Sequence, residues 1–171
     1  LAANVVWFNS QYHLDTFLDA LDTFLRRMPD HQPLQTIDII RRKSCVRYPG
    51  IEPLPPRRNR TDGPLHILWA ARWEHDKNPE RFFQALDRLE GAGIDFSVSV
   101  IGGYAGHDPL PCFISARQRF DRRIRHWGYQ DSRDAYRSVL AEADIIVSTA
   151  DHEFFGISVV EAISAGAIPL V

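Results

Sequence analysis

The feature that most constrains the fold is a repeated alternation of short apolar runs and amphipathic stretches from residue 65 onward. Each apolar run has the length of a buried strand, and apolar residues at helical spacing follow it. We predict strands at 65–71, 96–101, 126–129, 145–148 and 168–171, with helices between them. Strands joined through helices pair in parallel, and helices then cover both faces of the sheet. The sequence therefore predicts an α/β domain with a Rossmann-like parallel sheet and helices on both faces.

Two of the predicted helices carry boundary signals. Asn78 is expected to cap a helix in which Pro79 takes the first position and Gly91 follows the end. The next helix is expected to extend from Phe113 to Ile124, because apolar residues recur there at helical spacing. Ligands of open parallel sheets bind beyond the carboxyl ends of the strands. We therefore expect a functional site in the loops that follow the strands.

The chain before residue 65 divides into a small structured part and a linker. An apolar run at 5–8 leads into an amphipathic helix that Pro29 stops, and a further strand is expected at 45–48. The stretch 52–64 contains four prolines, a glycine and clustered charges, which prevent a regular element. We predict the end of one domain at 1–51, a linker at 52–64 and a second domain at 65–171.

Both ends of the chain are expected to be cuts through a larger protein. The chain opens on Leu1 directly before a predicted strand, and it ends as another strand begins. The second domain is therefore expected to be incomplete.

Composition points to a reduced, cytoplasmic protein with no membrane span. The formal net charge of −2 gives no global field that would mark a nucleic-acid or membrane protein. Two distant cysteines do not make a disulfide scaffold. No apolar run approaches the roughly 20 residues of a membrane span, and no signal peptide is recognised.

Two cations flank the segment between the strand at 65–71 and the helix after it. Arg72 follows the strand and Lys77 directly precedes Asn78, so both are expected at the carboxyl edge of the sheet. The helix N-terminus beside them adds unpaired N–H groups and about half a positive charge. Together these groups suit a diphosphate. The alternative is a solvated loop whose own charges pair with one another.

A second polar cluster surrounds the start of the helix predicted at 157–165. Glu153 is expected in the loop before it, Gly156 permits close backbone approach, and the amides up to Ser158 open the helix. Glu161 lies about one turn inside. Two carboxylates beside a helix N-terminus can hold neutral hydroxyls while the amides face phosphate. Taken singly, each acid could also be an ordinary solvated or early-helix glutamate.

These two clusters resemble the donor-site motifs of the family-4 (group 1) glycosyltransferases, which have the two-domain GT-B fold. The family's Arg-x4-Lys pair is matched by Arg72 and Lys77, and its Glu-x7-Glu motif by Glu153 and Glu161. The resemblance covers nearly the whole chain. It implies that the second domain is the C-terminal, nucleotide-sugar-binding domain of a GT-B fold, and that the first fifty residues end the acceptor-binding domain.

The resemblance also implies a role for each matched residue in a retaining transfer. Arg72 and Lys77 would offset the charge on the leaving diphosphate, Glu153 would contact the donor sugar, and Glu161 would contact the ribose. Donor-binding backbone is implied at Gly102, Gly103, Gly156, Ile157 and Ser158. No cofactor and no metal would be required, and no Asp-x-Asp metal motif occurs in the chain.

Two short sequence segments resemble the corresponding segments of a narrower group within the family, the tRNA-queuosine α-mannosyltransferases. They are Trp-Glu-His-Asp-Lys at 73–77 and His-Glu-Phe-Phe-Gly at 152–156. This resemblance implies GDP-mannose as donor and queuosine in tRNA as acceptor. Since most of an acceptor domain is not in this sequence, we expect the chain alone to be inactive in transfer.

Other function classes remain open on the residues alone. A sugar-nucleotide epimerase would use the same diphosphate site without a second substrate. A dehydrogenase is disfavoured, because no Gly-x-Gly-x-x-Gly follows a predicted strand. A binding module without catalysis could contact an RNA backbone through an arginine-rich run, although a solvated helical face explains the run as well. That run comprises Arg117, Arg119, Arg122, Arg123 and Arg125.

Overall fold

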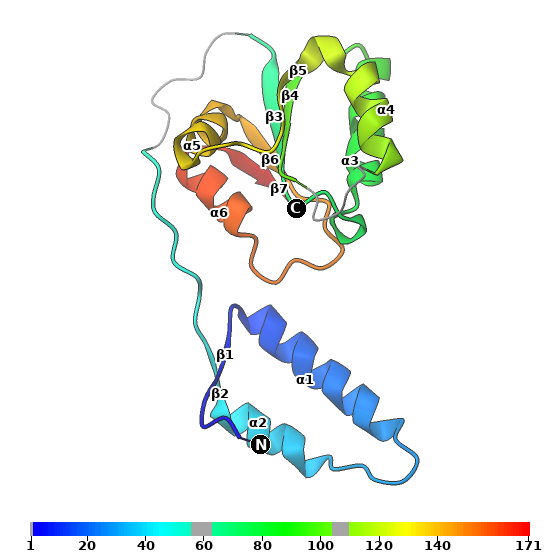
Figure 1. Cartoon of the computed structure of the whole chain (residues 1–171), viewed down its shortest axis with the longest axis vertical. Coiled ribbons are helices and arrows are strands. Elements are labelled where there is room, and N and C mark those ends of the chain that lie inside the picture. The colour runs from blue at the N-terminus through cyan, green and yellow to red at the C-terminus, as the bar shows by residue number, and fades with distance from the viewer. Residues whose placement is uncertain (1, 56–62, 104–109) are drawn as a thin grey trace. The chain divides into compact units, whose positions relative to one another are not determined.

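The structure is a computed structural model that describes residues 2–55, 63–103 and 110–171 (Figure 1). The chain forms two compact units, Leu1–Gly50 and Ile51–Val171. Leu1 and residues 56–62 of the predicted linker lie outside the described residues. Each unit is described by itself below.

The first unit is a small parallel pair of strands with two helices. Its elements are β1 (Val6–Phe8), α1 (Gln11–Arg26), α2 (Gln35–Lys43) and β2 (Ser44–Val46). The two strands pair in parallel, with Trp7 opposite Cys45. Helix α1 begins after Ser10, whose hydroxyl accepts a hydrogen bond from the amide of His13 at 3.0 Å. The first strand and the first helix lie where the sequence predicts them, whereas β2 ends at Val46 and not at residue 48.

The second unit contains the predicted parallel sheet. Its strands are β3 (Leu65–Ala70), β4 (Phe96–Ile101), β5 (Ile124–Gly128), β6 (Ile145–Val147) and β7 (Ile168–Leu170). Every neighbouring pair is parallel, and the strands lie in the order β5-β4-β3-β6-β7. This finding confirms the α/β class and the parallel sheet.

Helices cover both faces of this sheet (Figure 1). They are α3 (Pro79–Gly91), α4 (Pro111–Arg119), α5 (Arg133–Glu142) and α6 (Ile157–Ser164), with short 3-10 turns η1 (His75–Lys77) and η2 (Asp121–Arg123). Alternate residues of β3 face the two layers. Ile67 and Trp69 pack in the cluster with α3 and α4, whereas Leu68 and Ala70 pack in the cluster with α5 and α6. Because both alternating sets of side chains are buried, residues 67–70 form a continuous apolar run.

The order of the strands creates a switch point between β3 and β6. The chain runs from β3 to β4 and β5 toward one edge, and then returns to β6 on the other side of β3. Connections therefore diverge at the carboxyl ends of these two strands, and such a divergence leaves a crevice where ligands bind. The segments with Arg72 and Glu153 follow these strands. Both predicted clusters consequently belong to the same edge of the sheet.

Three local predictions are wrong. Helix α4 ends at Arg119, and Ile124 is the first residue of β5, where it pairs with Val98. Phe120 and Ile124 pack against the same core cluster, which preserves a helical spacing although the chain has changed element. Gly91 is the last residue of α3 and not the residue after it.

Asn78 occupies the predicted N-cap position, but its side chain does not cap α3. Its backbone is left-handed, with φ of 49°, and its side-chain amide donates instead to Asp151 at 3.3 Å. The structure therefore has a contact between two loops where the sequence predicted a local cap, and this is the third wrong prediction.

In the described ranges, none of the helices has the length and hydrophobicity of a membrane-crossing segment.

Candidate functional site

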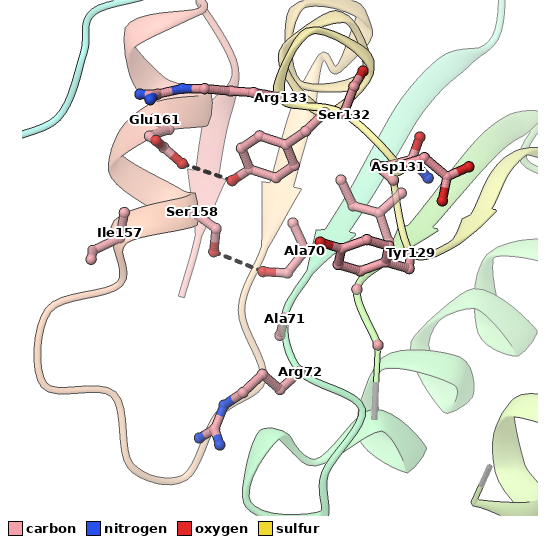
Figure 2. Close-up of a pocket in the computed structure, with 15 residues that line it drawn as sticks. Ala70, Ala71, Arg72, Tyr129, Asp131, Ser132, Arg133, Ile157, Ser158 and Glu161 are labelled. Atoms are coloured by element: carbon pink, nitrogen blue, oxygen red, sulfur yellow. Dashed lines mark hydrogen bonds between the residues drawn. The ribbon is translucent and has the colours of Figure 1, made fainter. Parts of the chain in front are cut away.

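A pocket of about 600 Å³ opens at the switch point (Figure 2). The ends of β3 and β4, the loop after β5, and the first turns of α5 and α6 contribute its walls. Six of the predicted site residues line it: Arg72, Gly102, Gly103, Ile157, Ser158 and Glu161. Figure 2 shows Arg72 toward one end of the pocket and Glu161 toward the other.

Lys77 and Glu153 line a smaller neighbouring cavity of about 10 Å³. Ala70, Ala71 and Ser158 line both this cavity and the large pocket, so the two hollows share a wall. Gly156 lines neither of them. The structure thus brings the predicted residues to one region and divides them between two adjacent hollows.

Gly102 allows the ends of β3 and β4 to approach closely at the pocket floor. Its φ of +134° is rarely adopted by residues with a side chain, and a Cβ there would overlap the carbonyl oxygen of Ala71. The amide of Gly102 donates to the carbonyl of Gly128 at 3.1 Å, and the carbonyl of Gly103 accepts from the amide of Trp73 at 2.9 Å. These bonds hold three strand ends together around the pocket.

The two predicted cations differ in their surroundings. Arg72 is exposed, at 66% of its side chain, and its guanidinium lies 2.9 Å from Glu74 Oε2. Lys77 is enclosed, at 11%, and its Nζ lies 3.2 Å from Glu153 Oε2 and 3.4 Å from Asp76 Oδ2. The alternative of a self-paired loop therefore describes Arg72. It describes Lys77 only in part, because Lys77 pairs with Asp76 of its own loop and also with Glu153 of the second predicted cluster.

A set of hydrogen bonds fixes the loop that carries Lys77. Thr149 Oγ1 donates to the carbonyl of Lys77 at 2.8 Å and accepts from Trp69 Nε1 at 3.1 Å. The amide of Asp151 donates to the carbonyl of Asp76 at 3.1 Å. Because Trp69 belongs to the core, these bonds tie the position of Lys77 to the body of the sheet. Neither Thr149 nor Asp151 was predicted as a site residue from the sequence.

The start of α6 is shaped by Glu153 and Ser158. Gly156 is left-handed, with φ of 76°, and its amide donates to Glu153 Oε1 at 3.0 Å. Ser158 Oγ donates to the carbonyl of Ala70 at 2.7 Å and so anchors the helix to the end of β3. The first turn of the helix adds amides without partners inside the helix and the positive end of its dipole. Beside Arg72, this terminus can attract an anion.

Glu161 lies in the second turn of α6 and is held by a tyrosine. Tyr136 Oη donates to Glu161 Oε2 at 2.7 Å, and both residues line the large pocket. Burial, and then the hydrogen bond to Glu161, raise the pKa of Tyr136 well above its usual value, so the phenol stays neutral and remains a donor.

Six lining residues from the loop after β5 and from the first turns of α5 were not predicted from the sequence. They are Tyr129, Gln130, Asp131, Ser132, Arg133 and Tyr136. The loop from 129 to 133 follows β5 at the same carboxyl edge as the other site segments, so the rule for open sheets could have identified it. Tyr136 lies on a helix whose apolar spacing indicated only packing.

The arginine-rich run is partly neutralised. Arg119 lies 2.9 Å from Asp87 Oδ1, and Arg123 contacts Glu90 at 3.0 Å and Asp95 at 2.8 Å. These pairs fit a solvated, self-paired surface better than a free cationic face.

Within the three described ranges, no group of three or more His, Cys, Asp or Glu side chains is arranged to hold a metal ion.

Two family models match the chain in sequence. The model described as "Glycosyl transferases group 1" matches residues 51–171, and the model described as "tRNA-queuosine alpha-mannosyltransferase N-terminal" matches residues 1–51.

Curated relatives agree with these matches. A tRNA-queuosine alpha-mannosyltransferase of Drosophila melanogaster is 33% identical over 181 residues, which cover 99% of this chain and 48% of the relative. A GDP-mannose-dependent alpha-(1-6)-phosphatidylinositol dimannoside mannosyltransferase of Mycobacterium tuberculosis is 29% identical over 105 residues, which cover 58% of this chain and 25% of the relative. The chain therefore spans half or less of the length of the relatives it matches.

The fold is shared with solved glycosyltransferase structures. The apo form of the lipopolysaccharide outer core galactosyltransferase WaaB superposes with a TM-score of 0.64 at 18% identity, over 98% of this chain and 42% of that one. The sheet flanked by helices is thus that of a GT-B glycosyltransferase domain. By its sequence match over residues 51–171 and by this fold, the chain belongs to the group 1 glycosyl transferases.

Proposed function

We propose that the second unit binds the nucleotide-sugar donor of a retaining glycosyltransferase, and that this donor is GDP-mannose. The observation that carries the proposal is the pocket at the switch point, which is lined by Arg72, by the start of α6 and by Glu161. A diphosphate with a ribose at one end requires an anion site next to a hydroxyl-binding carboxylate. The pocket offers both.

The pairing of Lys77 with Glu153 supports a mode of donor binding. A bound diphosphate would replace Glu153 as the partner of Lys77, because phosphate oxygens are strong acceptors for an ammonium group. Glu153 Oε1 would keep its bond to the amide of Gly156, and its other oxygen would become available to a sugar hydroxyl. The same exchange would free Arg72 from Glu74. Binding would thus convert two internal ion pairs into donor contacts.

Charge stabilisation is the chemical task of this arrangement. As the bond between the sugar and the diphosphate breaks, negative charge grows on the leaving oxygens. Once the donor is bound, Arg72, Lys77 and the amides at the start of α6 would already face the leaving group, and they would stabilise that charge without further reorganisation. The acceptor would attack from the face that the diphosphate leaves, with Glu153 positioning the sugar. We propose on this basis that transfer requires neither a cofactor nor a divalent cation.

The proposed acceptor is queuosine in tRNA, and the proposed compartment is the cytoplasm. The acceptor is supported by the names of the N-terminal family model and of the Drosophila relative, and the compartment is proposed because those names specify a tRNA substrate. The mannose donor is supported by the Drosophila and Mycobacterium relatives, whose names specify mannosyl transfer.

Mannosyl transfer by the full-length protein tests this function. The protein is incubated with GDP-mannose and with tRNA that carries queuosine, and tRNA digests are analysed by mass spectrometry for an added hexose. We expect the added mass on this tRNA and none on the same tRNA lacking queuosine, and we expect no loss of activity with EDTA. Transfer to neither tRNA, or transfer from UDP-glucose in preference to GDP-mannose, would contradict the proposal.

A further inference from the structure

We propose that Tyr136 is a positioning residue of the donor site, and that its phenol orients the Glu161 carboxylate toward the two vicinal hydroxyls of the donor ribose. The inference rests on the proposed function, because Glu161 must face a ribose for the orientation to matter. It adds a residue from a different helix and from a part of the sequence without a donor motif.

The two carboxylate oxygens of Glu161 differ in their contacts with the protein. Tyr136 Oη donates to Glu161 Oε2 at 2.7 Å, and this is the hydrogen bond found for that carboxylate among the described residues. Glu161 Oε1 has no hydrogen-bond partner in those ranges, and both residues line the pocket. One carboxylate oxygen is therefore fixed by the protein, while the other is available to a ligand in the pocket.

Fixing one oxygen matters because a glutamate side chain has three rotatable bonds. An unconstrained carboxylate must lose that rotational freedom when it binds a ligand, and this loss reduces affinity. A bond to Tyr136 removes part of the freedom before the ligand arrives. The expected benefit is therefore confined to ligand groups that contact Glu161.

Packing and helix capping fix the position of the Tyr136 side chain. Its ring packs against the core cluster formed with α5 and α6, and its helix begins after Ser132, whose hydroxyl accepts from the amide of Ala135 at 3.1 Å. Three residues earlier on the same helix, Arg133 lies 2.7 Å from Glu52 and so is not paired with Glu161. Tyr136 is thus a neutral partner that leaves the charge of the Glu161 carboxylate intact.

A purely structural role for Tyr136, as a wall of the pocket, makes a different prediction. A wall affects every ligand in the pocket to the same extent, whereas an orienting bond affects only ligands that have ribose hydroxyls. The two roles are therefore separated by comparing a nucleotide with its analogue that lacks those hydroxyls.

The experiment measures the Kd of GDP and of 2′,3′-dideoxy-GDP for the full chain and for Tyr136→Phe. UDP and its 2′,3′-dideoxy form are measured in parallel. If the site binds uridine nucleotides and not guanosine nucleotides, the comparison is made with this second pair. For the parent, we expect removal of the hydroxyls to weaken binding about 10-fold or more, since they bind a charged acceptor. For Tyr136→Phe, we expect about 10-fold weaker binding of GDP and little change for the dideoxy form. Equal weakening of both forms, or no weakening of either, would overturn the inference.

Two further variants keep the inference separate from the proposed function. Glu161→Ala should bind GDP and dideoxy-GDP equally. If it distinguishes them as the parent does, or if no nucleotide binds the parent, the proposed ribose site itself is wrong. If Glu161→Ala behaves as expected but Tyr136→Phe matches the parent, only the role of Tyr136 is wrong. Tyr129→Phe also removes a phenol from the pocket, and we expect it to affect the two forms alike, because no bond joins Tyr129 to Glu161 in the described structure.

Discussion

His66 lies within the sheet with both ring nitrogens bound by serines of the next strand. Nδ1 lies 2.8 Å from Ser97 Oγ and Nε2 lies 2.9 Å from Ser99 Oγ, and the side chain is 1% exposed. Burial, together with the positive charge of Arg125, lowers the pKa of His66 from 6.5 to about 4. The ring is therefore neutral in the folded protein at neutral pH.

This depressed pKa predicts a loss of stability in mild acid. Between pH 6.5 and about 4 the unfolded chain binds a proton at His66 that the folded chain does not, so the free energy of unfolding falls as the pH falls. Between pH 7 and pH 5 the expected loss from this group is about 2 kcal/mol. Urea unfolding at both pH values measures it.

The matched control replaces the whole hydrogen-bonded set by apolar groups, as His66→Leu/Ser97→Ala/Ser99→Ala. This variant leaves no hydroxyl buried without a partner. It should lose about 2 kcal/mol less than the parent over the same pH interval. An equal loss in the two proteins would show that His66 does not titrate with the lowered pKa.

Single residues also show what sequence reasoning can predict. Arg72, Lys77 and Glu153 were expected at the carboxyl edge of the sheet because strand ends and helix starts can be read from apolar spacing and caps, and they follow β3 and β6 in the structure. That these residues and Glu161 bind a donor stays a prediction. Tyr136 could not be predicted in this way, because the role that we propose for it depends on a contact with Glu161, which lies 25 positions further along the chain.

At the scale of elements, the close approach of β3 and β4 depends on Gly102. Gly102→Ala would place a methyl group against the carbonyl of Ala71 in a backbone conformation that alanine rarely adopts. We expect a loss of several kcal/mol of unfolding free energy, about 3 or more, since overlap and backbone strain add. Thermal and urea unfolding measure the loss.

Gly91→Ala is the matched control for that variant. Gly91 is the last residue of α3, and nothing lies within 4 Å of a Cβ added there. Alanine favours the helical state by up to about 1 kcal/mol relative to glycine, so this variant should be as stable as the parent or slightly more so. Similar stability of Gly102→Ala and Gly91→Ala would contradict the role assigned to Gly102.

Elements were predicted well where the apolar spacing belongs to one element, and poorly where the same spacing continues from one element into the next. The strands β3, β4, β6 and β7 fall close to their predicted positions because each is a mainly apolar run bounded by polar loops, whereas β5 begins two residues before its predicted start. The end of α4 was misplaced because Phe120 and Ile124 bury the same face while belonging to different elements. The left-handed Asn78 was read as a cap because its loop contact with Asp151 is not visible in the sequence.

At the scale of the whole molecule, the order of the strands explains why two separate sequence motifs form one site. Arg72 and Glu153 are far apart in the chain, but β3 and β6 are neighbours in the sheet. Their division into two hollows with a common wall could not be predicted, because it depends on how Ala70, Ala71 and Ser158 fill the space between. Because the two hollows share this wall, we propose that one extended ligand contacts both clusters.

The most direct test of the account is a calorimetric titration of the chain with GDP-mannose, UDP-glucose and ADP-glucose. Lys77→Ala and Glu161→Ala are compared with Lys43→Ala, whose ammonium group contacts only the carbonyl of Ala3 among the described residues, and with Glu80→Ala on α3.

We predict that GDP-mannose binds best, and that Lys77→Ala and Glu161→Ala each weaken its binding about 10-fold or more, since each removes a charged partner. The two control variants should bind as the parent does. If none of the three sugar nucleotides binds, or if Lys77→Ala and Glu161→Ala both bind as well as the parent, the pocket at the switch point is not the donor site.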